Sequence, residues 1–594
     1  MTYLRSLLAL LMGLCLLAGC TAGGEQPEDE FRPTLQIQQA GDYSVEYKSK
    51  DTDAAIESGA RQIRLQGDTI AFNGTSSLAT VEGSVITIKK GGTYVVSGTL
   101  TNGQIVVEEP GDEAVRLVLS CAEIRSESSA PIYIKEAKKV VLVLAENTYN
   151  TVTDSTLYTT VDSETNEPNA AIFSKADLTV TGGGALTVRA NYNNGINSKD
   201  KLKITDGTLT VTAAGNGLKG KDCVAIGGGT VTISAGHDGI KASNTADVNK
   251  GFVRVDGGRV VITAEQDGIQ AATGLVVTNG TVDITTGGGS ANASDDGNWG
   301  DWGEQGDSAS AKALKAGADI AVSGGVLTVD ASDDAVHSNG NVLIQGGTLS
   351  LSSGNDGVHA DNTLIVSGGD LVLHKSYEGL EALGIAITGG KTHVTASDDG
   401  INAAGGSDRS AMGDRPGQNG FAATAGAKVE ITGGYLVLDA GGDGLDSNDT
   451  VTMTGGIVLI YGATGDHGAI DYVSSFTMNG GLLVAAGDAE MAETITAGSV
   501  HAVHLTCAPQ AAGTPLRVQD EKGDEIITLV PPKGYSSAVI AAPDMVEGES
   551  YTVFVGGGCE GSVTDGVANG GTYTPGEISG QVTLSGVSTT LDLR

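Results

Sequence analysis

The stretch Lys201–Leu218 reads KLKITDGTLTVTAAGNGL, and 22 residues later the chain reads CVAIGGGTVTISAGHDGI. Each stretch holds two short segments in which aliphatic residues alternate with other residues, with a Gly-centred turn between them. Each also ends on Asn or Asp, then Gly, then an aliphatic residue. Alternation over four to six residues predicts short strands with one buried face. The two stretches therefore predict a repeat of short strands with turns at fixed places.

Both features recur along the chain at a common step of about 22 residues. The Gly-centred turn returns from Gly207 to Gly456, and two double steps of 44–45 residues contain insertions. Insertions at fixed places are typical of a stack in which each repeat is one structural unit. The acid-Gly-aliphatic motif begins at Asn194, Asn216, Asp238, Asp267, Asp334, Asp356, Glu378, Asp399 and Asp443.

A single repeat is too short to bury its own apolar face, so successive repeats must stack with like residues on like. Three short strands in about 22 residues predict an all-β fold, a right-handed parallel β-helix. A propeller is the alternative, but its blades need about 40 residues and antiparallel hairpins. We expect regular coils over residues 171–486 and less regular coils back toward residue 84. Residues 490–594 lose the repeat and predict a small β-sandwich-like domain.

The first residues predict a targeting segment. Arg5 precedes an apolar run that is too short to span a bilayer and fits a signal-peptide core. The run ends in Leu-Ala-Gly-Cys, which resembles a lipobox with Cys20 as the lipidated residue. We expect a lipoprotein signal peptide at 1–20 and a polar tether at 21–34, which place the chain outside the cell, held to the outer face of the membrane by lipid alone. An ordinary secretory signal is the alternative.

Composition limits the partners. The chain has 594 residues, 35 Lys and Arg, 72 Asp and Glu, and a formal net charge of −37. This balance excludes a broad basic footprint for nucleic acid, and an acidic ligand would need a bridging cation. The cysteines beyond the signal are far apart and lack a C-x-x-C pair, which argues against a zinc site. Cys507 and Cys559 are candidates for one disulfide, and Cys121 and Cys223 for buried apolar positions.

A family resemblance adds to these predictions. The strings Pro168–Lys175 and Asn191–Ile196, followed by the serial Asp-Gly-Ile motifs, resemble the bacterial carbohydrate-binding-domain β-helix lipoproteins over roughly residues 35–490. The resemblance implies a fold similar to pectate lyases, calcium sites, and binding of plant cell-wall polysaccharide such as polygalacturonate or cellulose. It implies binding more than degradation. Residues 35–489 are then a carbohydrate-binding domain, expected to act as a monomer, and the role of 490–594 stays open.

The recurring acids are candidate calcium ligands. Stacked coils lie about 4.8 Å apart, so an acid in every coil brings like charges together. Calcium binds clusters of carboxylate and carbonyl oxygens and would relieve the repulsion. The alternative is that Asp only serves the turn before Gly, which Asn at two of these positions supports. The candidate ligands are Asp238, Asp267, Asp295, Asp296, Asp333, Asp334, Asp356, Asp398 and Asp399.

The residue after each aliphatic position forms a second column, which alternation predicts to face outward beside the acids. Lysine there would give a charge-assisted hydrogen bond to a uronic acid carboxylate. Two Trp in the insertion at 287–310 would stack on sugar faces. The alternatives are a solvated face of mixed charge and an acidic loop. The candidate carbohydrate-binding residues are Lys219, Lys241, Lys315, His337, His359, Trp299 and Trp302.

The same residues allow a second function, calcium-dependent β-elimination. A lyase needs calcium to acidify the proton that is removed and an uncharged Lys or Arg to accept it. Abundant carboxylates raise a lysine pKa and oppose that role, and no lyase motif is present. We therefore predict a binding protein without catalytic residues. A pectate-lyase-like enzyme and a structural adhesin stalk are the alternatives.

Overall fold

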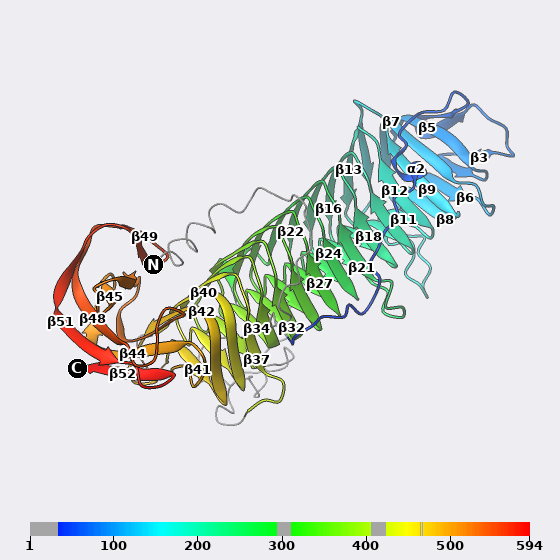
Figure 1. The fold of residues 1–594 in the computed structure, drawn as a ribbon. Coiled ribbons are helices and arrows are strands. Elements are labelled where there is room, and N and C mark those ends of the chain that lie inside the picture. Colours follow the sequence, from blue (N-terminus) through cyan, green and yellow to red (C-terminus); the bar gives the residue numbers. More distant parts are fainter. Residues whose placement is uncertain (1–33, 294–309, 405–422, 464, 466) are drawn as a thin grey trace, which may run out of the picture.

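The computed structural model describes residues 34–293, 310–404, 423–463, 465 and 467–594, and these are largely β-strand. Their helical content is a four-residue helix, α2 (Ser49–Thr52), and a three-residue 3-10 turn, η1 (Ser290–Asn292). None of the helices in these ranges is long and apolar enough to cross a bilayer. Figure 1 shows an elongated stack of strands. The prediction of an all-β chain built on a large, mostly parallel sheet is confirmed.

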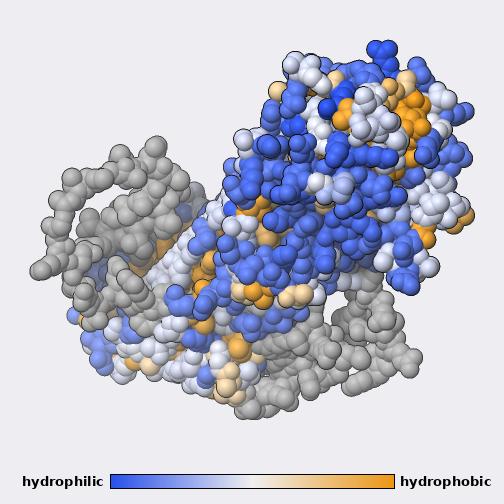
Figure 2. All heavy atoms as spheres, turned by 90° about the vertical axis from the view of Figure 1, so that its right-hand side faces the viewer, coloured by the Kyte–Doolittle hydropathy of each residue, from blue (hydrophilic) through white to orange (hydrophobic). Residues whose placement is uncertain are grey.

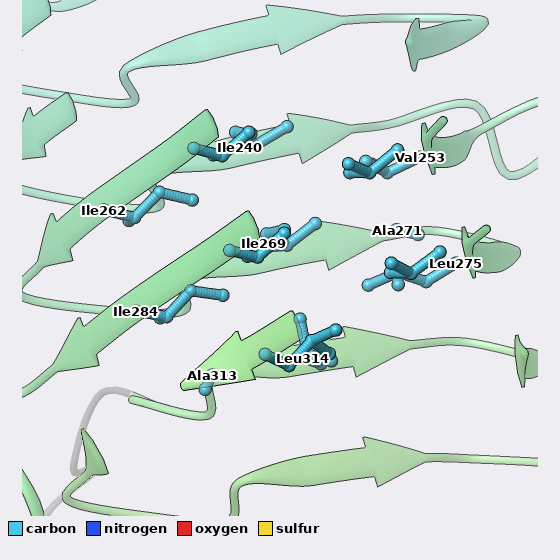
Figure 3. Close-up of a cluster of buried hydrophobic side chains, with 14 of the residues drawn as sticks. Ile240, Val253, Ile262, Ile269, Ala271, Leu275, Ile284, Ala313 and Leu314 are labelled. Atoms are coloured by element: carbon cyan, nitrogen blue, oxygen red, sulfur yellow. The ribbon is translucent and has the colours of Figure 1, made fainter. Parts of the chain in front are cut away.

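One coil illustrates the stack. Strand β16 (Thr208–Ala213) is followed by β17 (Leu218–Gly220) and β18 (Cys223–Ile226). Each pairs in parallel with the strand three places later, so that Leu218 lies against Ile240. Because the register matches equivalent residues of successive coils, aliphatic side chains stack on aliphatic side chains (Figure 3). The buried cluster runs without a break from Ile63 to Ala541.

The strands form three ribbons along the stack. Ribbon 1 comprises β10 (Tyr149–Thr153), β13 (Ala185–Ala190), β16, β19 (Thr230–Ala235), β22 (Arg259–Ala264), β25 (Thr281–Thr286), β28 (Val326–Ala331), β31 (Thr348–Ser353), β33 (Asp370–Lys375), β35 (Lys391–Ala396) and β38 (Tyr435–Ala440). Ribbon 2 comprises β6 (Gln104–Glu108), β8 (Ile132–Glu136), β11 (Ala170–Ser174), β14 (Asn194–Ser198), β17, β20 (Ile240–Ala242), β23 (Ile269–Ala271), β26 (Leu314–Ala316), β29 (Val336–Ser338), β36 (Ile401–Ala403), β39 (Leu445–Ser447) and β41 (Ile470–Tyr472). Ribbon 3 comprises β9 (Lys139–Leu144), β12 (Asp177–Thr181), β15 (Lys201–Ile204), β18, β21 (Phe252–Val255), β24 (Gly274–Val277), β27 (Asp319–Val322), β30 (Asn341–Ile344) and β37 (Lys428–Ile431).

Six longer strands each serve two ribbons in turn. Each continues through two short-strand positions of one coil as one strand, and the register shifts at the join. They are β5 (Gly92–Leu100), β7 (Val115–Arg125), β32 (Val358–Val366), β34 (Leu380–Ile387), β40 (Thr450–Tyr461) and β42 (Ser475–Gly487).

The Gly-centred turns between ribbons 3 and 1 are tightly stacked. Gly229 has φ +81°, and a Cβ there would lie 2.6 Å from the carbonyl oxygen of Gly207 in the preceding coil. Only glycine adopts this backbone at so short an approach without strain. The Gly column of the sequence thus marks the corner where successive coils contact one another most closely.

Both ends of the stack are capped, which protects edge strands from pairing with other chains. At the N-terminal end, the hairpin of β1 (Arg61–Gly67) and β2 (Thr69–Phe72) and that of β3 (Ala79–Glu82) and β4 (Val85–Ile88) precede the first coils. The face of this end is mostly hydrophilic, with small apolar groups (Figure 2).

At the other end, β47 (Tyr535–Ala542) pairs antiparallel with β42 and β44 (His501–Gln510), and β52 (Ser588–Leu593) joins β44. A second, six-stranded sheet follows. Its core includes Leu459 and Tyr461 of β40. The remaining strands are β43 (Ala497–Gly498), β45 (Leu516–Asp520), β46 (Glu525–Leu529), β48 (Ser550–Cys559), β49 (Ser562–Thr564), β50 (Val567–Asn569) and β51 (Tyr573–Thr583).

The cysteine predictions are corrected in part. Cys507 and Cys559, the candidates for a disulfide, are both free thiols in this structure. Cys121 is exposed in a left-handed conformation (φ +55°) at a bend within β7, instead of being buried. Cys223 is buried as expected.

An extended segment before the first strand, residues 34–53, lies along ribbon 3 and crosses the coils in reverse order (Figure 1). Its start donates from the Thr34 backbone N–H to Glu430 Oε2 at 2.7 Å. Further along, Tyr47 donates to Asp256 Oδ2 at 3.0 Å, and Asp51 accepts from Thr179 at 3.0 Å. The sequence repeat does not predict this strap, because its partners are far away in the chain.

Candidate functional site

The recurring acids stack at the turn from ribbon 1 into ribbon 2 and form what we call the inner ladder. A side-chain oxygen in one coil accepts the backbone N–H of the equivalent residue in the next coil: Asn216 Oδ1 accepts from Asp238 at 3.2 Å, and Asp334 Oδ1 from Asp356 at 3.0 Å. These acids and amides thus satisfy backbone donors at the turns. The inner ladder comprises Asn194, Asn216, Asp238, Asp267, Lys312, Asp334, Asp356, Glu378, Asp399 and Asp443.

The outer ladder lies three residues further on in each coil. Its side chains point away from the aliphatic core, but the expectation that all of them face solvent is wrong: His337 is 1% and His359 3% exposed. Lys219, Lys241 and Lys315 are partly exposed. The outer ladder comprises Asn197, Lys219, Lys241, Gln270, Lys315, His337, His359, Glu381, Asn402 and Asp446.

In the middle of the stack the two ladders pair with each other. Lys241 Nζ lies 2.7 Å from Asp238 Oδ2, and Lys315 Nζ lies 3.5 Å from Asp267 Oδ2. These cations compensate the negative charge that we expected calcium to neutralise at Asp238 and Asp267.

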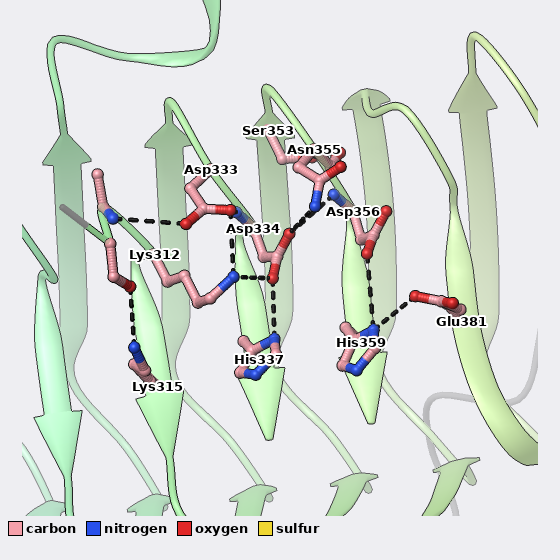
Figure 4. Close-up of polar contacts among 12 residues, drawn as sticks. Lys312, Lys315, Asp333, Asp334, His337, Ser353, Asn355, Asp356, His359 and Glu381 are labelled. Carbon is pink, nitrogen blue, oxygen red and sulfur yellow. Dashed lines mark hydrogen bonds and ion pairs between the residues drawn. The ribbon is translucent and has the colours of Figure 1, made fainter. Parts of the chain in front are cut away.

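Lys312 is an exception within the inner ladder. It stands where the other coils have Asp, Asn or Glu, and its Nζ lies 2.5 Å from Asp334 and 3.1 Å from Asp333 (Figure 4). Burial alone would raise the pKa of Asp334, but Lys312 and His337 hold that pKa well below its usual range. We missed Lys312 in the sequence, although Lys312-Ala313-Leu314 matches Asp334-Ala335-Val336 in position.

At the N-terminal side of the ladders a small pocket opens across neighbouring coils. Its volume is about 170 Å³. Lys219 makes no ion pair within the described ranges, because the inner ladder carries Asn there. Burial, then the charges of Lys241 and Lys199, lower the pKa of Lys219. The lining residues are Asn169, Asn197, Lys199, Lys219, Lys221 and Ser243. We call this region the basic end.

A larger pocket of about 460 Å³ lies between the strap and ribbon 3 and also contains lysines. Most of these are already paired with acids: Lys139 and Lys203 with Asp51, and Lys250 with Asp222 at 2.8 Å. In the smaller pocket Lys199 is also paired, with Glu167 at 2.7 Å, but Lys219 and Lys221 make no ion pair with the described residues. The smaller pocket is therefore the better candidate for an anionic ligand.

At the C-terminal side both ladders turn acidic. Burial, then Asp471 and Asp443, raise the pKa of Asp446 to about 7, and burial with Asp471 raises that of Asp443 to about 6. Burial with neighbouring acids also raises the pKa of Asp399 well above its usual range. Asn402, 3% exposed, lies between Glu381 and Asp446, and its buried Oδ1 has no hydrogen-bond partner. We call this region the acidic end.

The other predicted residues are placed as follows. Asp356 is buried, and burial with Glu381 and Asp334 raises its pKa well above the usual range. Asp398 is partly exposed beside Asp399. Asp295, Asp296, Trp299, Trp302 and Cys20 lie outside the described residues.

Comparison with known proteins gives a family match. The model of a family described as "Carbohydrate-binding domain-containing protein" matches residues 82–357. These residues include the basic end and the paired middle of the ladders. The match supports carbohydrate binding as the general function.

A curated protein of the same description from Acetivibrio thermocellus is 42% identical over 152 residues, which are 26% of this chain and 53% of that protein. The chain thus spans about half the length of this curated relative. A solved structure described as the polysaccharide lyase-like protein from C. thermocellum, gadolinium derivative, is 41% identical, with a TM-score of 0.38, and the alignment covers 39% of this chain and 92% of that one.

Proposed function

We propose that this protein is a lipoprotein, anchored at Cys20 to the outer face of the cell membrane, that binds acidic plant cell-wall polysaccharide such as polygalacturonate with the help of calcium. In this proposal the stack is a right-handed parallel β-helix that presents the ladders as a linear binding surface. The proposal is narrower than the carbohydrate binding that the family match supports.

The basic end carries the proposal. In a chain with a net charge of −37, three lysines, two asparagines and a serine line one pocket. Lysine ammonium groups form charge-assisted hydrogen bonds with carboxylates, and the amide and hydroxyl groups suit sugar hydroxyls. Because Lys219 has no acidic partner there, an arriving carboxylate would supply the missing negative charge.

Calcium fits the acidic end on the chemistry of its donors. Carboxylate and amide oxygens are the ligands that calcium prefers, and Asn402, the register partner of Asp446, has a buried Oδ1 without a hydrogen-bond partner. Asp399, Asp443, Asp446 and Asn402 would hold the ion, of which we predicted only Asp399 as a ligand. Burial disfavours ionisation of these acids, and a bound divalent cation would favour their ionised form.

One observation favours a second function, calcium-dependent lyase activity. The pKa of Lys219 is lowered by burial and by Lys241 and Lys199, whereas we expected surrounding carboxylates to raise it. A lysine with a lowered pKa is a better proton acceptor near neutral pH. Lys219 is therefore the residue that would abstract the proton in a β-elimination, and this function would need a calcium ion at the basic end in addition to the one proposed at the acidic end.

One experiment separates these functions. The purified chain is incubated with polygalacturonate and with the same polymer after reduction of its carboxyl groups, each with and without a calcium chelator. A binding protein of the proposed kind is retained by polygalacturonate alone, less so with chelator, and releases no unsaturated uronide. Equal retention on both polymers contradicts acidic specificity. Release of unsaturated uronide, abolished by Lys219→Ala, establishes the lyase instead, and no retention on either polymer favours the adhesin stalk.

A further inference from the structure

Two histidines of the outer ladder lie on adjacent coils in the centre of the stack. His337 is in β29, His359 is in β32, and the two are register partners in the parallel pairing of these strands. Their rings stack with centroids 4.7 Å apart and planes 9° apart. Both are almost fully buried, which does not suit the sugar-contacting role that we predicted for them.

A carboxylate holds each ring at Nδ1. His337 Nδ1 lies 2.8 Å from Asp334 Oδ2, and His359 Nδ1 lies 2.5 Å from Glu381 Oε2 (Figure 4). In metal sites, a carboxylate at one imidazole nitrogen commonly fixes the ring and increases the basicity of the other nitrogen. The pair thus has the outer support that metal-binding histidines have.

A third potential ligand stands beside the rings. Asp361, on the same strand as His359, places Oδ1 3.1 Å from His359 Nε2. One ring nitrogen of each histidine and one carboxylate oxygen of Asp361 lie within 4.8 Å of one another. Because Nδ1 of each ring faces its own carboxylate, we assign Nε2 as the ligand atom of both rings.

We propose that His337, His359 and Asp361 form a binding site for a divalent transition-metal ion of the zinc class, with Asp334 and Glu381 orienting the two rings. Two imidazole nitrogens and one carboxylate suit zinc and its neighbours, whereas calcium prefers oxygen ligands. The site is therefore distinct in chemistry from the calcium proposed at the acidic end. The cysteine spacing that argued against zinc does not bear on a site built from histidines.

Metal binding requires a small adjustment of these side chains. Zinc–nitrogen bonds are about 2.0–2.1 Å long, so ligand atoms up to 4.8 Å apart must close in by up to roughly 1.5 Å. Asp361 is only partly buried, with a side chain 19% exposed, and has room to move. Tilting of the two stacked rings brings their Nε2 atoms together at an ion between the coils.

Three carboxylates surround the His359 ring: Glu381 and Asp356 at Nδ1, 2.5 and 3.6 Å away, and Asp361 at Nε2, 3.1 Å away. The carboxylates around the rings thus favour a positive charge at this place in the stack. A divalent ion supplies that charge and leaves both imidazoles neutral, as metal ligation requires.

The test uses Co²⁺ as a spectroscopic substitute for Zn²⁺. The full chain, purified in detergent and stripped with chelator, is titrated with Co²⁺ and then with Zn²⁺, and visible absorption and metal content are measured. We expect one Co²⁺ per chain with a spectrum of nitrogen and oxygen ligation, displaced by Zn²⁺ but not by excess Ca²⁺. His337→Gln and His359→Gln should each weaken binding at least tenfold, and Glu381→Gln less strongly. His374→Gln, at an exposed histidine of β33, should leave binding unchanged.

Melting curves show whether the buried variants are folded. If they are not, the Asp361→Asn variant tests the site instead. This side chain is partly exposed, so its replacement should leave the chain folded and still weaken Co²⁺ binding. Three results overturn the proposal: no Co²⁺ or Zn²⁺ retained by the unaltered chain, equal retention by the folded histidine variants or by Asp361→Asn, or displacement of Co²⁺ by Ca²⁺. None of these results depends on polysaccharide binding, so they leave the proposed function to its own test.

Discussion

The coils of the basic end and those of the acidic end have the same backbone arrangement but carry opposite charge. At the basic end Asn216 and Lys219 occupy the inner and outer positions, and at the acidic end Asp443 and Asp446 occupy them. The backbone pairing is parallel and in register at both ends. The fold therefore fixes where these side chains lie but leaves their charge open, and the two ends can bind ions of opposite sign.

The largest expected effect is at the junction between the two ends. Lys312→Met removes the cation beside Asp334, which is fully buried. Removing one partner of a buried ion pair costs about 3–5 kcal/mol. Because His337 and Asn355 each stay 2.8 Å from Asp334, we expect the free energy of unfolding, measured in urea, to fall by about 3 kcal/mol.

Lys315→Met is the matched control for this variant. Lys315 is the outer-ladder residue of the same coil. Its side chain is 24% exposed, and its Nζ lies 3.5 Å from Asp267 Oδ2. We expect a loss of at most about 1 kcal/mol, as for other solvent-screened pairs. Equal losses in the two variants would show that Lys312 has no special role in joining the ends.

Calcium should stabilise the acidic end. An ion that binds only the folded chain at 100 times its dissociation constant adds about 2.7 kcal/mol. We expect the melting temperature to rise with calcium at pH 7.5, and Asn402→Ala with Asp446→Asn to remove most of the increase. The same rise in this double variant would place the calcium elsewhere in the molecule.

Without metal, the acidic end should make stability depend on pH. The folded-state pKa values of Asp443 and Asp446, about 6 and about 7, lie above the ordinary value of 3.8. Between these values the folded chain binds more protons than the unfolded chain, so stability falls as pH rises. We expect the free energy of unfolding to be about 1–2 kcal/mol larger at pH 5 than at pH 7.5. One pKa unit corresponds to about 1.4 kcal/mol, and solvent partly screens these two carboxyl groups.

Asp446→Asn checks the source of that pH dependence. It removes one of the two carboxyls and should flatten the curve of unfolding free energy against pH over this range. An unchanged curve, measured in the same metal-free buffers, would mean that other groups produce it.

The smallest expected effect on stability is at the basic end. Lys219→Met removes a cation that has no acidic partner and that burial and neighbouring lysines disfavour. We expect the free energy of unfolding to change by less than about 0.5 kcal/mol. A loss above 2 kcal/mol in urea unfolding would indicate that Lys219 is a structural residue.

The sequence predicts the repeating part of the fold well, because residues at the same place in successive repeats pair with each other. The Gly column and the alternating aliphatic residues place the strands, and the stacking of Leu218 on Ile240 follows from them. The repeat does not predict the strap at 34–53. Contacts of the strap, such as that of Thr34 with Glu430, join residues that are far apart in the chain and follow no period.

The sequence predicts where the residues of the candidate site lie better than it predicts what they do. The two columns are adjacent, as expected, but their charges pair with each other before any ion is added, as Lys241 does with Asp238. Charge pairing depends on side-chain direction and burial, which a sequence column does not give. The burial of His337 and His359 was missed for the same reason.

Binding at the basic end is tested most directly by the affinity for polygalacturonate of the unaltered chain, Lys219→Met and Lys522→Met, measured by calorimetry at one calcium concentration and low salt. Lys522 is an exposed lysine near the C-terminal sheet and serves as the charge-matched control. Loss of a charge-assisted hydrogen bond costs about 1.5–3 kcal/mol. We predict at least tenfold weaker binding for Lys219→Met and no change for Lys522→Met. Equal affinity of all three proteins would contradict the claim that the basic end binds the acidic polysaccharide.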